Sequence, residues 1–113
     1  VIQIGVNFNL AAGTTEHGIA VQGTDVRFYS EFGGAAGNDI SVGATLTFNY
    51  GNYPGFNIDD LNGWSQTYNF GVMVVDGGWG SSYDGKYNSA HIGISFSPFL
   101  VTGSFNSTYT VVY

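Results

Sequence analysis

The stretch SVGATLTFNY, residues 41–50, restricts what this chain can fold into more than any other segment. Hydrophobic residues take every second position from Val42 to Tyr50, and small uncharged residues take the positions between, from Ser41 to Asn49. A period of two places the two sets on opposite faces of a β-strand. A wet strand face usually carries Lys and Glu, which keep sheets apart. The stretch therefore predicts a strand and leaves open what its small polar face contacts.

The same alternation recurs along the chain and predicts about seven strands. They are expected near residues 2–10, 17–22, 25–32, 40–50, 66–75, 90–97 and 104–113. Gly, Asn, Asp, Ser and Pro residues predict turns at 11–15, 22–25, 33–39, 51–55, 76–85 and 97–99. A helical turn is expected only within 57–64, with Asn57 or Asp59 as N-cap and Gly63 as the stop. This pattern predicts one all-β domain over residues 1–113, an antiparallel β-barrel or β-sandwich.

Four of the expected strands share the local pattern apolar-Gly-apolar-x-apolar. The segments are IGVNF (4–8), VGATL (42–46), FGVMV (70–74) and IGISF (92–96). In each segment the glycine lies on the face opposite the large side chains, although glycine weakens a strand by roughly 0.5–1 kcal/mol relative to Ala. Glycine inside a strand often marks a close approach of another backbone. We therefore predict that the small polar face packs closely at these positions.

The charge content excludes several classes of partner and chemistry. Charged residues make up 9% of the 113 residues and the net charge is −6, whereas about 25% is typical of soluble domains. Arg27 and Lys86 are the only basic residues apart from two histidines, so no basic surface for nucleic acid can form. The chain has no Cys, which excludes disulfides and thiolate metal sites. The opening VIQIGVNFNL alternates and is not a signal-peptide core, so an export signal is expected to have been removed or to lie on a longer precursor.

Three interpretations of the small polar face remain open. It can be a solvated surface, although Lys and Glu are then missing. It can line the lumen of a membrane β-barrel whose large side chains face lipid, because segments 2–10 and 40–50 have the required length of about 9–11 residues. It can also pack on a second sheet or on another copy of the chain, as a homo-oligomer. In 25–32, where Arg27 and Glu31 share a face with Tyr29, we expect an ordinary solvated face.

No residue pattern predicts catalysis, a metal or a cofactor. His17 and His91 belong to no motif that joins them to a nucleophile, and a hydroxyl nucleophile needs an adjacent base. His91 lies on the small polar face, where a hydrogen-bonded structural role is expected. DGGWGSSYDG, 76–85, has an Asp at each end and is the best candidate for calcium, but it lacks the EF-hand spacing. We therefore predict a protein that is not an enzyme, with no catalytic residue, metal or cofactor.

A lectin-like site is the one ligand site that the residues suggest. Trp64, Trp79 and Tyr83 fall outside the expected alternating strands, and Asp76 accompanies them. Exposed aromatic rings stack on sugars, and Asp can bond the hydroxyls. Trp is also well suited to fill the end of a barrel, because its ring is large and apolar with one polar edge. The predicted ligand-binding residues are Trp64, Asp76, Trp79 and Tyr83, and filling of a barrel end is the alternative.

The order of several segments resembles the glycine-rich C-terminal region of bacterial RHS-repeat and related polymorphic-toxin proteins. The segments are SEFGGAAG (30–37), SVGATLTF (41–48), IDDLNGWS (58–65) and the closing TGSFNSTYTVVY. This resemblance covers most of residues 28–113 and implies a module carried by a large secreted bacterial protein. It assigns no catalytic residue, and the charged clusters usual in nuclease-type toxins are missing here.

Together these observations predict a non-enzymatic, secreted or surface-located bacterial β module that acts at a membrane or cell surface, including by forming a pore. Membrane lipid or a cell-surface glycan is the expected partner. A soluble carbohydrate-binding domain and a structural, self-associating β domain are the alternatives.

Overall fold

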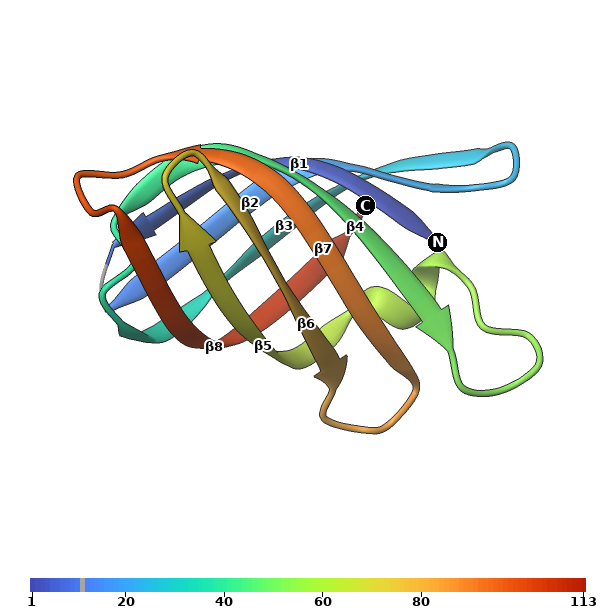
Figure 1. The fold of residues 1–113 in the computed structure, drawn as a ribbon. Coiled ribbons are helices and arrows are strands. Elements are labelled where there is room, and N and C mark those ends of the chain that lie inside the picture. The colour runs from blue at the N-terminus through green and yellow to red at the C-terminus, as the bar shows by residue number, and fades with distance from the viewer. Residues whose placement is uncertain (11) are drawn as a thin grey trace.

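The computed structural model describes residues 1–10 and 12–113 and is a closed, antiparallel β-barrel (Figure 1). The all-β prediction is confirmed. The barrel has eight strands and one short 3-10 helix, whose bounds are β1 Ile2–Leu10, β2 Gly13–Gln22, β3 Asp25–Gly37, β4 Ser41–Gly51, η1 Ile58–Leu61, β5 Gly63–Val72, β6 Val75–Ser82, β7 Tyr87–Phe96 and β8 Val101–Val112. Of the turn expected at 11–15, residue 11 lies outside the described residues, and the prediction was wrong for residues 13–15, which belong to β2.

The additional strand is β6, which occupies most of the segment 76–85 that was predicted to be a turn. The segment was predicted to be a turn because glycines are common in turns. In β6 the glycines instead allow the backbones of neighbouring strands to approach closely. A Cβ on Gly78 would overlap the Tyr68 carbonyl oxygen and lie 2.7 Å from the His91 ring. Glycine at this position therefore reflects close packing inside the barrel and not a change of chain direction.

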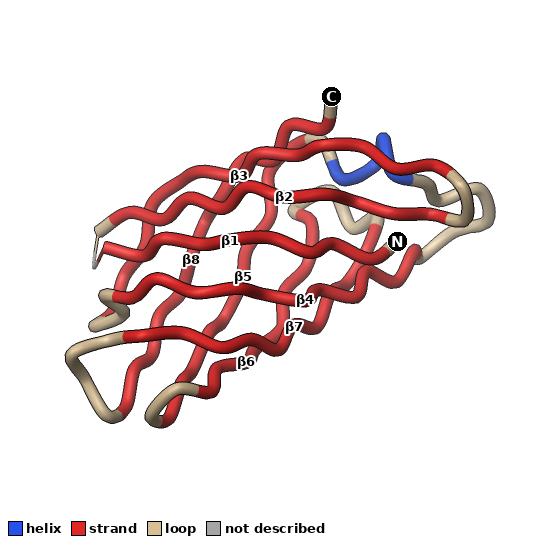
Figure 2. The backbone as a smooth tube through the Cα atoms, turned by 90° about the horizontal axis from the view of Figure 1, so that it is seen from above, coloured by secondary structure: helices blue, strands red, loops and turns tan. Residues whose placement is uncertain are grey.

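The strand order around the barrel is β1-β2-β3-β8-β5-β6-β7-β4. Each half of the chain is a Greek key, because the fourth strand of each set returns to pair with the first: β4 pairs with β1, and β8 pairs with β5. Three connections consequently cross an end of the barrel. Residues 38–40 and 97–100 cross one end, which also carries the turn 73–74, and we call it the hairpin-tip end. Residues 52–62 cross the other, the η1 end, where both termini lie (Figures 1 and 2).

The short helix η1 forms where the sequence predicted a helical turn, and it covers its end of the barrel. Asn57 is the N-cap, and its side chain and that of Asp60 form a reciprocal capping box. The cap presents Ile58 and Leu61 to the barrel, where each is only 1% exposed. They pack with Tyr29 and with the other buried hydrophobics, Ala20 and Tyr87. This small cluster is the apolar core found among the described residues, and it lies at one end of the barrel.

The two faces of the strands have the opposite orientation from an ordinary water-soluble barrel. Along β1 exposure alternates strictly, with the hydrophobic residues from Ile2 to Leu10 exposed and the residues between them buried. The small polar face therefore looks into the barrel. The predicted close approach at the glycines is confirmed, because a Cβ on Gly43 would overlap the Ile94 carbonyl oxygen and lie 2.8 Å from the Cα of Ser95.

Candidate functional site

The outward side chains of the strands form a largely apolar surface, which we call the outer wall, and exposed large hydrophobic residues lie on every strand except β2. Phe28 is 67% exposed, Ile92 is 61% exposed and Ile94 is 60% exposed. Water-soluble monomers seldom expose contiguous apolar patches larger than a few hundred square ångströms. The wall includes the following exposed residues: Ile2, Ile4, Val6, Phe8, Val26, Phe28, Phe32, Val42, Phe48, Trp64, Tyr68, Phe70, Val72, Val75, Trp79, Ile92, Ile94, Phe96 and Val101. A surface of this kind needs a partner that covers it.

None of the ten charged residues of the chain, all of them described, lies on the outer wall. Three of them, Glu16, Glu31 and Asp76, lie on strands and line the central cavity. Asp39 also lines the cavity from the hairpin-tip end. The remaining six gather at the η1 end: Asp25, Arg27, Asp59, Asp60, Asp84 and Lys86. Charge is therefore separated from the wall by the fold, although it is spread along the whole sequence.

Polar side chains that do lie on the outer wall are bonded to one another. His17 Nε2 lies 3.0 Å from the Thr15 hydroxyl, and His17 Nδ1 lies 3.0 Å from the Ser30 hydroxyl. Ser30 in turn contacts the Tyr113 hydroxyl. Farther round the barrel, the Tyr83 hydroxyl lies 3.0 Å from that of Ser107. Such internal pairing satisfies polar groups without water.

The barrel interior is a network of polar side chains. The Tyr29 hydroxyl donates to Glu16 at 2.6 Å, the Thr108 hydroxyl donates to Glu31 at 2.8 Å, and both carboxylates face each other in register across β2 and β3. The central cavity measures about 70 Å³, which is space for a few water molecules. The chain therefore fills its own barrel with side chains and does not leave a wide channel.

This interior network is the part of the molecule that sequence reasoning missed. The face of 25–32 that carries Tyr29 and Glu31 was predicted to be solvated, but Tyr29 is only 1% exposed. The prediction was wrong because charges of both signs were interpreted as evidence of a solvated face. Only Arg27 of this face extends to the η1 end, whereas Tyr29 and Glu31 point into the barrel. His91 does line the cavity, as expected for the small polar face. The sequence did contain a signal for this interior position, because the period of a strand places Glu16 on the same face as the small residues Gly18 and Ala20.

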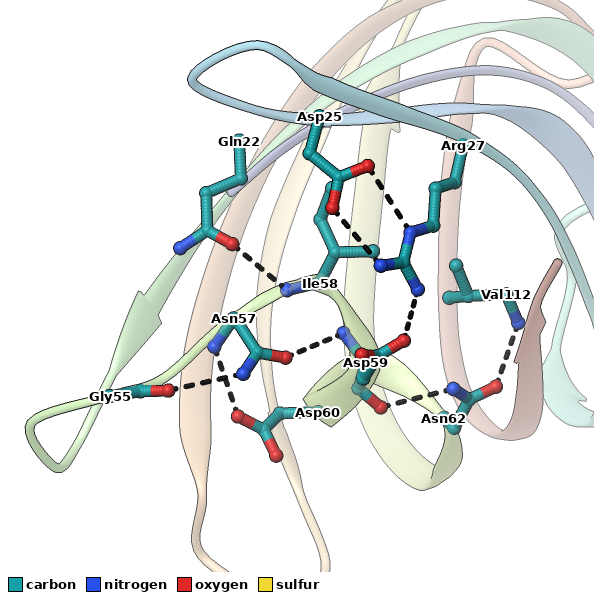
Figure 3. Close-up of polar contacts among 10 residues, drawn as sticks. All are labelled: Gln22, Asp25, Arg27, Gly55, Asn57, Ile58, Asp59, Asp60, Asn62 and Val112. Carbon is teal, nitrogen blue, oxygen red and sulfur yellow. Dashed lines mark hydrogen bonds and ion pairs between the residues drawn. The ribbon is translucent and has the colours of Figure 1, made fainter.

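The charged residues of the η1 end hold η1 onto the barrel (Figure 3). The Arg27 guanidinium bonds Asp25, at 3.1 Å, and Asp59 of η1. Lys86 Nζ lies 3.7 Å from carboxylate oxygens of both Asp60 and Asp84. The Tyr53 hydroxyl that donates to Asp60 lowers the pKa of that carboxyl, with support from the Asn57 amide and Lys86. These ion pairs and hydrogen bonds attach η1 to the barrel at a partly solvent-exposed surface.

The four predicted ligand-binding residues do not converge. Trp64 and Trp79 lie on the outer wall at 55% and 56% exposure, whereas Asp76 points into the barrel and lines its cavity. Tyr83 lies in the turn between β6 and β7. The Trp64 ring packs edge-on against Tyr109, and the Trp79 ring stacks on Tyr68. Neither Trp fills a barrel end, because Ile58 and Leu61 of η1 fill it instead, so that alternative was wrong.

The described residues contain no cluster of three or more His, Cys, Asp or Glu that could hold a metal ion. Within the same part of the chain, no helix is long and apolar enough to cross a membrane. Comparison with protein-family models, with curated proteins and with solved structures gives no match for this sequence or fold. The functional argument consequently depends on the wall, the interior and the two ends described above.

Proposed function

We propose that this chain is a non-enzymatic β-barrel that is embedded in a lipid membrane through its outer wall. One observation carries the proposal: the wall is largely apolar, and all ten charged residues point inward or lie at the ends. Water favours the reverse arrangement, because burying apolar surface is the main driving force of folding. In lipid, by contrast, the polar groups belong inside and the apolar side chains outside.

The length of the strands supports the same conclusion. β1, β5 and β4 have 9, 10 and 11 residues. At about 3.3 Å per residue and a tilt near 40°, such strands rise roughly 25 Å, which matches the apolar band of membrane barrels. Closure also leaves no sheet edge, so every strand pairs on both sides and no edge exposes its peptide groups to lipid.

The proposal is for a barrel embedded in the membrane. The interior of the barrel does not support the predicted pore. Side chains leave a central cavity of about 70 Å³, and residues 52–62 cross the η1 end of the barrel. A pore would instead have to form between the outer walls of several copies of the barrel. Secretion, bacterial origin and relation to polymorphic toxins remain predictions that come from the resemblance.

A charge placed on the wall tests the proposal. Ile92 is 61% exposed in the middle of β7, so Ile92→Lys should change stability by less than about 0.5 kcal/mol if water covers the wall. If lipid covers it, the change costs about 2–4 kcal/mol, and the fraction of protein that floats with phosphatidylcholine vesicles falls by roughly 30-fold or more. Thr24→Lys, in the β2–β3 turn at the η1 end, is the matched control and should float like the parent protein.

The same flotation assay separates the alternatives. Failure of the parent protein to float, together with unchanged solution behaviour of Ile92→Lys, would contradict the membrane proposal. A second copy of the chain covering the wall would instead give a discrete oligomer in detergent-free buffer that Ile92→Lys dissociates. The glycan alternative retains only the exposure of Trp64 and Trp79 as support, and it predicts binding to sugars without any vesicles.

A further inference from the structure

The two ends of the barrel differ in chemistry. The η1 end holds six of the ten charged residues, and its two-residue β2–β3 turn is Gly23-Thr24. The hairpin-tip end carries apolar side chains at its outermost positions. Leu100 is 74% exposed, Met73 is 67% exposed, and Val74 and Phe99 are 49% and 42% exposed. The apolar surface therefore continues from the wall over one end only.

The turn residues at the hairpin-tip end are not those that turn formation favours. β5 and β6 are joined by the two residues Met73-Val74, and Met73 has a φ of 59°. Two-residue hairpin turns favour Asn or Gly in this left-handed conformation, because other side chains strain the backbone. At the η1 end the comparable positive φ values belong to Gly23 and Gly85. An apolar side chain is therefore kept at the tip in spite of its backbone cost.

The backbone of the hairpin-tip end is hydrogen-bonded from one turn to the next. The Met73 amide donates to the Leu100 carbonyl at 2.7 Å, and the Ser95 amide donates to the Val74 carbonyl at 3.0 Å. The Asn38 side chain accepts from the Gly103 amide at 2.8 Å and donates to the Val101 carbonyl at 3.1 Å. A peptide group in lipid has no water to bond and costs several kcal/mol if left unpaired. Cross-bonding of the turns removes much of that cost.

The outward Tyr and Trp side chains follow the same polarity. Near the η1 end the outward aromatics include several with polar groups: Trp64 is paired in register with Tyr109, and Tyr50 and Tyr83 lie at the same end, together with Phe28 and Phe48. Near the hairpin-tip end the exposed aromatics are the phenylalanines Phe70, Phe96 and Phe99. Trp and Tyr prefer the boundary between lipid and water, whereas Phe is at home in hydrocarbon.

We infer that the barrel has a fixed polarity in the bilayer: the hairpin-tip end, with Met73, Val74, Phe99 and Leu100, is inserted in the acyl chains, and the η1 end stays in water. The inference depends on the proposed membrane function and adds the direction in which the barrel inserts. The ligand of the tip surface is the lipid acyl chain, since the tip offers no basic group to a headgroup. Asp39, the charged residue at this end, accepts from the Ser41 hydroxyl at 2.7 Å and lines the cavity instead of the tip surface.

Single-cysteine labelling can test this polarity cleanly, because the chain has no Cys of its own. Leu100→Cys and Asp84→Cys each receive an environment-sensitive fluorophore in phosphatidylcholine vesicles that contain lipids with a nitroxide deep in the acyl chain. Nitroxide quenching of the Leu100 label should exceed that of the Asp84 label at least about threefold, and iodide in the buffer should quench the Asp84 label preferentially. Equal quenching of the two labels, or the reverse order, overturns the inference while vesicle binding itself persists.

A turn exchange provides the second measurement. Replacing Met73→Gly together with Val74→Thr copies the Gly23-Thr24 turn of the η1 end and places glycine at the position whose φ is positive, so the barrel should fold at least as well in detergent. Vesicle partitioning should nevertheless fall about tenfold or more, because two apolar side chains leave the tip. Thr24→Gly, in the corresponding two-residue turn at the η1 end, should partition like the parent protein. Unchanged partitioning of the double variant overturns the inference, and failure of the parent protein to bind vesicles overturns both it and the proposed function.

Discussion

Replacement of Gly43 by valine tests whether the interior glycines admit a neighbouring backbone. A Cβ at this position would overlap the Ile94 carbonyl oxygen and lie 2.8 Å from the Ser95 Cα on β7. Unbonded carbon atoms prefer about 3.5–4.0 Å, so β4 and β7 would have to separate by roughly 1 Å near this point. Both clashing atoms belong to the backbone, so no change of rotamer relieves the overlap.

The magnitude follows from the hydrogen bonds between β4 and β7. A displacement of about 1 Å moves an N–H···O bond beyond its usual range of 2.7–3.2 Å, and each lost backbone bond costs about 0.5–1.5 kcal/mol. Two such bonds, added to an overpacking cost of about 1–3 kcal/mol, predict a loss of at least about 3 kcal/mol in the free energy of unfolding. Thr45→Val keeps the shape and removes only the 3.0 Å hydrogen bond to Asn7, so it should lose about 1–2 kcal/mol.

The assay is urea unfolding in detergent micelles, followed by tryptophan fluorescence. Gly34→Val is the matched control, because a Cβ at Gly34 meets no atom within 4 Å and valine suits a strand. The expected order of stability is Gly34→Val close to the parent protein, then Thr45→Val, then Gly43→Val. Equal stability of Gly43→Val and Thr45→Val would refute the argument that the glycine is required for close approach.

Three further changes have definite expected outcomes. Glu16→Gln should raise the free energy of unfolding at neutral pH by about 0.2–1 kcal/mol or more, because it removes a carboxyl group that is buried in the barrel interior and that faces Glu31 in register; the gain in urea midpoint should shrink on acidification, and a loss at neutral pH would contradict the interior assignment. Asn57→Ala should lower the melting temperature through a cap loss of about 1 kcal/mol, Asn57→Ser should restore it, and equal melting of the two variants would show that the cap contributes nothing. Trp79→Ala should weaken vesicle binding a few-fold by removing wall area and the ring stacked on Tyr68; loss of binding on a glycan array in this variant would instead support the carbohydrate alternative.

Local pattern was sufficient for the fold class and for some details of the site. The alternation from Val42 to Tyr50 indicated a strand with two unlike faces, and the glycines within such strands indicated close approach, which Gly43 confirms. The cap at Asn57 was also predictable, because capping depends on residues next to each other in the sequence. Such features require only the period of a strand or the spacing of a cap.

The sequence did not show that the four predicted ligand-binding residues fail to converge, because their spatial neighbours depend on how the sheet closes. Asp76 and Trp79 are three residues apart in one segment, yet the period of a strand sends one into the barrel and the other onto the wall. The segment itself was expected to be a turn, since glycines in a turn and glycines at a crowded strand crossing look alike. The interior pair of Glu16 and Glu31 likewise arises only when β2 and β3 align in register.

By itself, the sequence determined that this chain forms strands with one apolar and one small polar face, and that charge is too sparse for a nucleic-acid surface. Only the tertiary structure decided which face is inside, because a period of two separates two faces without saying which becomes concave. The Greek-key order, with β4 beside β1 and β8 beside β5, closes the sheet around the small residues. Glycine, Ser, Thr and Asn fit the crowded interior of an eight-stranded barrel, and the large side chains are therefore directed outward.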